Sequence, residues 1–251
     1  MVHMPEQVDS HSTPSDKPKL KHNYGIINKD YAFSLATCAP ENDGPIYMVN
    51  LMKYREVAEY DENGGGAASI SGREADDKYN PASILNKIGA SIVFVADVVG
   101  NHVGDEDWDR IAIVRYATRR SFIEMQSRKD FGEKHVHKAA GMLRTTLIAC
   151  RPVDTSLDAA DRPTPIESRT IAMVVRRTND RAAAVASLAD SQSLLAEGTV
   201  VGDGREWDTV QLQQVDSTAD VERIANDLST EPTDSVYVMS LRASLDSITR
   251  Q

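Results

Sequence analysis

The stretch Ile46–Tyr54, which reads IYMVNLMKY, decides the fold class of this chain. Apolar, β-branched and aromatic residues dominate it, and a proline precedes it, a pattern that indicates a β-strand. Three further runs of the same kind follow along the chain. They are Ser91–Val99 (SIVFVADVV), Asp109–Tyr116 (DRIAIVRY) and Arg144–Cys150 (RTTLIAC), so we expect four strands in this part of the sequence.

Two stretches between these strands predict helices. The first is Arg73–Ile88, and we expect an interruption near Pro81, because proline breaks a helix interior. The second is Arg119–His137, in which Phe122 and Met125 have the i, i+3 spacing of one helix face. The predicted order of elements is therefore strand, helix, strand, strand, helix, strand.

The same order recurs after a polar, proline-bearing linker at residues 153–168. In this second half the predicted strands are Thr170–Arg176, Thr199–Gly202, Thr209–Val215 and Ser235–Leu241, and the predicted helices are the alanine-rich Asp180–Leu195 and Thr218–Leu228, with Thr218 as N-cap. We divide the chain into a disordered arm and N-terminal extension (1–44, with a short helix at Lys29–Thr37), a first module (45–152), the linker and a second module (169–251).

A short repeated pattern suggests that the two modules arose by duplication. Gly104-Asp105 comes before Trp108-Asp109, and Gly202-Asp203 comes before Trp207-Asp208. The two tryptophans are the only ones in the chain and lie roughly 100 residues apart, much further than the 20–50 residues of solenoid repeats. Chance is the alternative explanation. We expect both Trp-Asp pairs to have a structural role, in packing and in capping a strand. This expectation holds whether the pattern arose by duplication or by chance.

These elements predict an α+β fold of two tandem ferredoxin-like βαββαβ modules. Such a unit packs both helices on one face of a four-stranded antiparallel sheet and leaves the other face bare. A bare apolar face needs a cover, so we expect the two sheets to pack face to face in a dimeric-α/β-barrel-type arrangement. The modules would pair within one chain as a pseudo-dimer or between two chains as a homodimer. A small-molecule pocket would form where the two sheets meet.

The composition limits the classes of partner and the cellular location. The chain has 251 residues with 38 acidic and 28 basic side chains, a formal net charge of -10. Negative charge disfavours nucleic acid and anionic membrane surfaces as partners. We find no apolar run long enough to span a bilayer and no signal-peptide core at the N-terminus. Cys38 and Cys150 make no disulfide framework, so we expect reduced thiols and a cytoplasmic protein.

Several motifs of the first module resemble a known family. They are MVNLMKY at 48–54, SGREA at 71–75 with Tyr79, Trp108-Asp109, YATRRSFIEM at 116–125 and HKAAG at 137–141. Together they resemble the dimeric α/β-barrel family catalogued as domain of unknown function 1330. Ala117 and Thr118 depart from the family's usual Tyr-Pro-Ser-Arg, and Lys138 stands where the family commonly has arginine. The second half is similar in element order only.

The resemblance implies a fold more than an activity. The wider superfamily includes cofactor-independent monooxygenases, polyketide cyclases, isomerases, muconolactone-type enzymes and haem proteins. We therefore expect chemistry on a small molecule and take candidate residues mainly from residues 46–150.

The strand Ile46–Tyr54 supplies three candidates. Asn50 lies between apolar neighbours and shares a strand face with Tyr54, so its amide is either satisfied inside the core or binds a ligand. Lys53 lies on the opposite face near the strand end. It would meet a substrate carboxylate or enolate there, or stay in solvent.

Asp97 interrupts the apolar run of the second strand. A carboxylate there needs a cationic partner or has a raised pKa, and Arg115 at the end of the next strand is the candidate partner. Together they would bind a carbonyl group, or form a structural ion pair. Arg73 and Tyr79 on the first helix follow a loop with Gly64–Gly66, which suits a mobile lid or has no function.

Histidines supply candidate proton carriers. His102 is expected in the loop after the second strand, and histidine is suited to act as a general base because its unperturbed pKa is about 6.5. A plain surface histidine is the alternative. His135 and His137 end the second helix, and their i, i+2 spacing excludes one shared metal. His137 matches the family motif and therefore ranks above His135.

The sequence predicts an enzyme that uses neither nucleotide nor metal and acts on a carbonyl-bearing, partly apolar compound. We find no dinucleotide fingerprint, P-loop, zinc-protease motif or nucleophile elbow. His137, His102 and Asp97 are the candidate catalytic residues, and Asn50, Lys53, Tyr54, Arg73, Tyr79 and Arg115 the candidate substrate-binding residues. No cofactor is expected. The alternatives are a haem-binding barrel with His102 or His137 as axial ligand, and a non-catalytic ligand-binding protein.

Overall fold

The computed structural model describes residues 23–61, 69–158 and 169–249. The strands are β1 (Ile26–Ile27), β2 (Ile46–Tyr54), β3 (Ser91–Val103), β4 (Arg110–Tyr116), β5 (Met142–Pro152), β6 (Thr170–Arg176), β7 (Gln192–Gly202), β8 (Thr209–Gln214) and β9 (Val236–Asp246). The α-helices are α1 (Lys29–Thr37), α2 (Gly72–Tyr79), α3 (Ala82–Lys87), α4 (Arg119–Gln126), α5 (Lys129–Gly141), α6 (Arg181–Ala186) and α7 (Thr218–Leu228). No helix within these ranges is long and apolar enough to cross a membrane.

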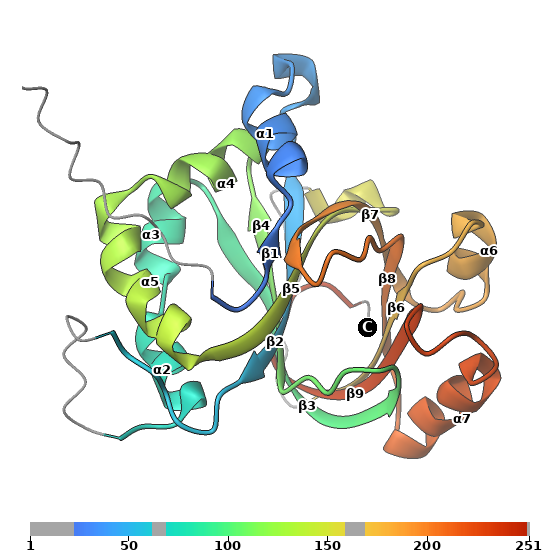
Figure 1. Cartoon of the computed structure of the whole chain (residues 1–251). Coiled ribbons are helices and arrows are strands. Elements are labelled where there is room, and N and C mark those ends of the chain that lie inside the picture. The colour runs from blue at the N-terminus through green and yellow to red at the C-terminus, as the bar shows by residue number, and fades with distance from the viewer. Residues whose placement is uncertain (1–22, 62–68, 159–168, 250–251) are drawn as a thin grey trace, which may run out of the picture.

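The strands form one closed antiparallel barrel. Their order is β7-β5-β2-β4-β3-β9-β6-β8, with β8 pairing back onto β7 and the short β1 added to β7 (Figure 1). The prediction of two tandem ferredoxin-like βαββαβ modules in a dimeric-α/β-barrel-type arrangement is therefore wrong. Strands of the two halves are hydrogen-bonded edge to edge through β3–β9 and β5–β7, instead of stacking face to face.

Closure of the barrel has a physical reason. The outer strands of an isolated four-stranded sheet leave unpaired N–H and C=O groups, and closure into a barrel removes such edges. The same curvature turns the apolar faces of both halves toward one axis, where they bury each other. All eight barrel strands come from one chain, and a homodimer stays a prediction.

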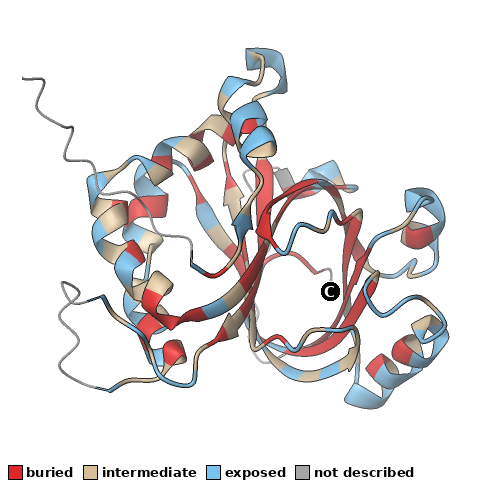
Figure 2. Ribbon diagram, viewed as in Figure 1, coloured by how far each residue is buried: buried red, intermediate tan, exposed pale blue. Residues whose placement is uncertain are grey.

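Alternate residues of each strand fill the barrel interior. Val49 of β2 pairs with Ile113 of β4 and Ile148 of β5, and all three are fully buried in one core. Side chains from the other half, such as Met173 and Met239, belong to the same core (Figure 2). The pocket that we expected between two facing sheets is thus occupied by packed side chains.

The two Trp-Asp pairs close one end of the barrel in the same way. Trp108 and Trp207 are both buried against Tyr237. Their ring centroids lie 5.9 and 4.7 Å, in that order, from the centroid of the Tyr237 ring. Asp109 accepts a hydrogen bond from the backbone N–H of Tyr54 at 2.8 Å, and Asp208 accepts one from Thr178 at 2.9 Å. The predicted roles in packing and strand capping are confirmed for both pairs.

Helices of the first half cover the outside of the barrel wall. Figure 1 shows α2 to α5 on one side of the barrel and α6 and α7 on the other. The helix α2 begins at a capping box made by Ser71 and Glu74, and the chain breaks before α3 at Pro81, as predicted. The helix predicted at Arg119–His137 is instead two helices, which separate at Ser127 and Arg128.

The second half departs most from its predicted elements. Asp180 is the N-cap of α6, but this helix ends at Ala186, and β7 begins at Gln192. The prediction of one helix over Asp180–Leu195 is therefore wrong. The alanine-rich part is helical, but Gln192–Leu195 pairs with β8, and this long-range pairing decides the end of the predicted segment. Ser217, not Thr218, occupies the N-cap of α7.

A close contact between two glycines sets the position of α5. A Cβ atom on Gly72 at the start of α2 would collide with the backbone oxygen of Gly141, and one on Gly141 would collide with the oxygen of Gly72. The backbone N–H of Arg55 also donates to the oxygen of Gly141 at 2.8 Å. The C-terminal part of α5 is therefore held against β2 and α2, and this part carries Lys138.

Candidate functional site

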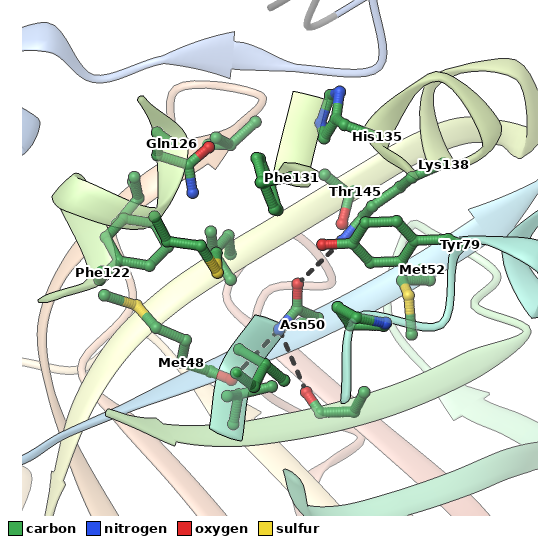
Figure 3. A pocket seen from close by; sticks show the side chains of 18 of the residues that line it. Met48, Asn50, Met52, Tyr79, Phe122, Gln126, Phe131, His135, Lys138 and Thr145 are labelled. Carbon is green, nitrogen blue, oxygen red and sulfur yellow. Dashed lines mark hydrogen bonds between the residues drawn. The ribbon is translucent and has the colours of Figure 1, made fainter. Parts of the chain in front are cut away.

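A cavity of about 430 Å³ lies outside the barrel wall, between β2, β4 and β5 and the helices that cover them. Drug-sized ligands bind in cavities of this size. Most of its lining is apolar. Its main apolar residues are Met48, Met52, Leu85, Val114, Phe122, Met125, Phe131 and Leu147, and its polar residues include Tyr24, Asn50, Asp76, Tyr79, Arg110, His135 and Lys138 (Figure 3).

Local periodicity explains which side chains reach this cavity. Met48, Asn50 and Met52 alternate with the inward-pointing residues of β2, so they face the helices and not the barrel core. On α5, the residues Phe131 and His135 are spaced i, i+4 and Lys138 follows at i+7, which places all three on one helix face. Asn50, His135 and Lys138 come from these two faces, and the other polar residues named above come from α2, β4 and the segment before β1.

Asn50 is held by the protein and in turn holds Lys138. Its side-chain N–H groups donate to the backbone oxygens of Met48 at 3.2 Å and Ala112 at 3.3 Å. Its Oδ1 accepts a hydrogen bond from Lys138 Nζ at 3.3 Å. Because both donors are used, Asn50 has only its acceptor oxygen left, and this oxygen is bonded to Lys138.

Lys138 is an amine in apolar surroundings. Burial lowers the pKa of its side chain below the usual value, and the charge of Asp76 only partly opposes this effect. No carboxylate in the described ranges forms an ion pair with it. Its Nζ lies 5.5 Å from the ring centroid of Tyr79, a cation–π distance.

Tyr79 adds a neutral donor. Burial raises the pKa of its hydroxyl well above the usual value, so the group stays protonated at all moderate pH values. Figure 3 shows this hydroxyl pointing into the cavity. Within the described residues it has no hydrogen-bond partner, so it is available to a bound oxygen atom.

His135 is the histidine of this site. It is buried, and its Nε2 lies 2.8 Å from the hydroxyl of Tyr24. Its ring also packs against Phe131 and Tyr79 with centroids 5.3 and 6.4 Å away. Burial, followed by the charge of Asp76, raises the pKa of Tyr24, so the tyrosine keeps its proton.

An ion-pair cluster closes the cavity near the end of β2. The hydroxyl of Tyr54 donates to Asp76 at 2.7 Å, and Arg110 lies 3.6 Å from Asp76 and 3.0 Å from Asp77. Both Asp76 and Arg110 line the cavity, but each is already paired. Tyr54 therefore supports this cluster and is itself no part of the lining.

Asn50 and Tyr79 are the two predicted site residues that line the cavity. Arg73 forms an ion pair of 2.7 Å with Asp97, whose side chain is exposed outside the cavity. The predicted pairing of Asp97 with Arg115 is wrong. Arg110 stands opposite Asp97 in the strand register, whereas Arg115 stands opposite Ser91 at the far end of β3.

Neither predicted catalytic histidine lines the cavity. His102 lies within β3, not in a loop, because that strand continues to Val103; its Nε2 is 3.0 Å from the hydroxyl of Ser240. His137 lies on another face of α5, where its Nδ1 is 2.9 Å from the hydroxyl of Tyr60. Burial, with smaller contributions from Lys78 and Lys134, lowers the pKa of His137.

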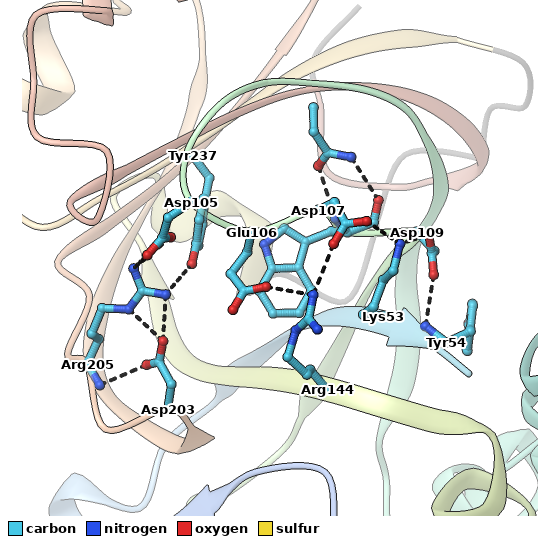
Figure 4. A network of polar contacts seen from close by, with 12 residues as sticks. Lys53, Tyr54, Asp105, Glu106, Asp107, Asp109, Arg144, Asp203, Arg205 and Tyr237 are labelled. Atoms are coloured by element: carbon cyan, nitrogen blue, oxygen red, sulfur yellow. Dashed lines mark hydrogen bonds and ion pairs between the residues drawn. The ribbon is translucent and has the colours of Figure 1, made fainter. Parts of the chain in front are cut away.

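Lys53 belongs to a polar network at the tryptophan end of the barrel. It contacts Asp107 at 2.5 Å and Asp109 at 3.0 Å. In the same network Arg205 pairs with Asp105 and donates to the hydroxyl of Tyr237 at 2.6 Å (Figure 4). The charge of Lys53 is thus compensated by the protein, away from the cavity.

The ranking by family motif missed His135 and Lys138. The available signal was the spacing of Phe131, His135 and Lys138, which puts the three on one face of α5, whereas His137 falls outside that face. The predicted lid at Gly64–Gly66 and the predicted arm at residues 1–22 lie outside the described residues. Within the described ranges, no group of three or more His, Cys, Asp or Glu side chains is arranged to hold a metal ion.

Comparisons with known proteins add little to this geometry. No family model matches the chain, and no curated protein is significantly similar to it. Among solved structures, RPA0582, a protein of unknown function from Rhodopseudomonas palustris, is 26% identical with a TM-score of 0.44 over 51% of this chain and 95% of its own. Methylated RPA0582 is 24% identical with the same TM-score, over 55% and 97%. The family resemblance stays a prediction.

Proposed function

We propose that this chain is an enzyme that acts on a small, carbonyl-bearing, partly apolar compound in the cavity, with its own side chains carrying out the chemistry. The observation that carries this proposal is Lys138, an amine in an apolar cavity that is hydrogen-bonded to Asn50 and has no ion-pair partner in the described part of the chain. Perturbed titratable groups in a cleft are typical of functional sites.

Two donors are positioned for one substrate oxygen. The ammonium of Lys138 and the hydroxyl of Tyr79 both face the cavity, and both would donate to a carbonyl oxygen. When a proton leaves the neighbouring carbon, negative charge grows on that oxygen. Preorganised donors in a site of low dielectric stabilise such charge strongly, commonly by a factor of about 100 to 1,000 in rate per donor.

His135 is the candidate proton carrier. It lies one helical turn before Lys138 on the same face of α5, and both residues line the cavity. An imidazole takes up and returns a proton near neutral pH. Removal of a proton next to the carbonyl and its return to another atom amounts to an isomerisation. Cyclases, lyases and cofactor-independent monooxygenases share the same first step, an enolate.

Deuterium exchange tests this proposal without knowledge of the natural substrate. Aromatic and aliphatic ketones and oxo acids would be incubated with the protein in D₂O, and loss of the proton next to the carbonyl followed by NMR. We expect exchange above the buffer rate with at least one compound, and a fall of at least about 100-fold in Lys138→Met. Lys134→Met removes a lysine charge from the exposed side of α5, so this variant should catalyse deuterium exchange at the wild-type rate.

A non-catalytic ligand-binding protein is the second candidate. Its support is that both polar candidates already have partners within the protein. Asn50 is bonded to two backbone oxygens and to Lys138, and Asp97 forms an ion pair with Arg73. Compounds that bind but never exchange would select this candidate and remove the enzyme. A haem protein would need His102 or His137 as axial ligand, and neither of them lines the cavity.

A further inference from the structure

We infer that the compound bound by the cavity is an oxo acid, in which a carboxylate and a nearby carbonyl oxygen both bind Lys138 while an apolar chain or ring fills the rest of the cavity. This inference rests on the proposed function and goes beyond it by naming the substrate class. Three features of the cavity support it: the lack of an ion pair at Lys138 among the described residues, the number of free donors, and the separation of polar and apolar parts.

Lys138 is the cation of the described lining that has no ion pair. Among the described residues, Lys138 and Arg110 are the cations of the cavity, and Arg110 is already paired with Asp76 and Asp77. Asp76 also accepts the hydroxyl of Tyr54. Among the described residues, the hydrogen-bond acceptor of Lys138 is the neutral amide oxygen of Asn50, and Asp76 acts on it through its charge alone. An ammonium without an ion pair in apolar surroundings is costly, and a ligand carboxylate would supply such a pair.

The number of donors calls for more than one oxygen. An ammonium has three N–H groups, and the protein uses one of them, toward Asn50. Two remain for a ligand, and the hydroxyl of Tyr79 is a third donor. A 2-oxo or 3-oxo acid can turn one carboxylate oxygen and its keto oxygen to the same side, so that both reach a single cation. A simple carboxylate or a simple ketone leaves part of this set unused.

The layout of the cavity separates the head of such a molecule from its body. Figure 3 shows Lys138, Tyr79 and Thr145 at one side of the cavity and Phe122 and Met48 at the other. The apolar side chains of Phe122 and Met48 lie at the distant side, together with the amide side chain of Gln126. An apolar chain that extends from the acid group toward Phe122 would bury its surface there at about 25 cal/mol per Å².

Three matched compounds test the inference by isothermal titration calorimetry. They are 2-oxooctanoate, octanoate, which lacks the keto group, and octan-2-one, which lacks the carboxylate. We expect 2-oxooctanoate to bind at least about 10-fold more tightly than octanoate and about 100-fold more tightly than octan-2-one, in line with charge-assisted hydrogen bonds. The Lys138→Met substitution should weaken the affinity for 2-oxooctanoate by about 100-fold and leave the affinity for octan-2-one nearly unchanged. The Lys134→Met variant should bind all three compounds like the wild type.

The outcomes separate this inference from the proposed function. Octan-2-one or octanoate binding to the wild type as tightly as 2-oxooctanoate would overturn the inference, and so would full affinity for 2-oxooctanoate in a folded Lys138→Met variant. If octan-2-one nevertheless loses its proton in D₂O, the proposed enzyme survives without the oxo acid. If 2-oxooctanoate binds as expected but never exchanges, the substrate class stands as a ligand class and the enzyme is removed.

Discussion

Tyr24 and His135 lie 111 residues apart in the chain, and a hydrogen bond of 2.8 Å joins their side chains in the wall of the cavity. Tyr24 belongs to the N-terminal segment, which is fastened to the barrel by a backbone bond from Thr145 to the oxygen of Tyr24 and by the pairing of β1 with β7. The segment that precedes the barrel therefore completes the cavity and fixes its histidine.

The hydroxyl of Tyr24 should matter for proton transfer and little for folding. Tyr24→Phe removes the hydrogen bond to His135 and should lower the rate of deuterium exchange about 10-fold, because the imidazole loses its orientation. A single hydrogen bond contributes about 1 kcal/mol to stability, so the protein should stay folded. Tyr60→Phe is the matched control, since it removes the equivalent hydroxyl from His137. Equal rates in the two variants would refute a positioning role for Tyr24.

The two histidines of α5 should differ sharply in their effect on exchange. His135→Asn removes the imidazole inside the cavity and should reduce exchange by about 100-fold or more, within the range for general acid–base catalysis. His137→Asn changes a side chain outside the cavity and should reduce it less than about 3-fold. The rates would be measured by NMR at several pH values. The opposite ranking would restore His137, the residue favoured by the sequence motif.

The partly buried amine of Lys138 should cost stability in a pH-dependent way. Its pKa is lowered from 10.5 in the folded protein, so the unfolded chain binds its proton more tightly. The full cost applies at pH values below the pKa of Lys138 in the folded protein. It falls as the pH rises above that pKa and disappears once the pH exceeds the pKa of the lysine in the unfolded chain. Lys138→Met should therefore stabilise the protein at pH 7, by about 1–3 kcal/mol, and the gain should shrink toward pH 10.

Thermal denaturation at the two pH values checks this expectation. A gain of 1 kcal/mol corresponds to about 2–4 °C in Tm for a chain of this size. Lys134→Met, on the exposed side of the same helix, should shift Tm little at either pH. A destabilised Lys138→Met variant at pH 7 would mean that its hydrogen bond to Asn50 outweighs the cost of burying the charge.

The glycine contact between α2 and α5 should tolerate no added methyl group. Gly141→Ala would push α5 away from Gly72 and should cost about 2–3 kcal/mol, the usual cost of overpacking. Gly44→Ala is the control, because no atom lies within 4 Å of a Cβ added there. The free energy of unfolding in urea would measure both. Equal stability of the two variants would show that α5 shifts freely.

Local patterns in the sequence located most of the strands. The run Ile46–Tyr54 is a strand with the predicted bounds, and the break at Pro81 and the helix Lys29–Thr37 are where we expected them. These features depend on side-chain periodicity and on proline, which act over a few residues. The same local reasoning failed at the end of Asp180–Leu195, where Gln192–Leu195 pairs with β8 and forms a strand.

The candidate site was only half visible in the sequence. Asn50 stood out as an amide within an apolar strand, and Tyr79 followed from the motifs of the first half. Asp97 and Arg115 looked like partners because they sit on neighbouring strands, but the register separates them. His135 was passed over for His137, since only the packing of α5 decides which of its faces meets the cavity.

By itself, the sequence determined the order of most strands and helices, because alternation, helical spacing and turn residues are properties of short segments. Only the tertiary structure decided that the strand edges pair across the two halves into one barrel and that the cavity lies outside it, beside Lys138. The physical reason is that every free sheet edge has backbone N–H and C=O groups without hydrogen-bond partners. Which two edges pair depends on contacts between residues far apart in the chain.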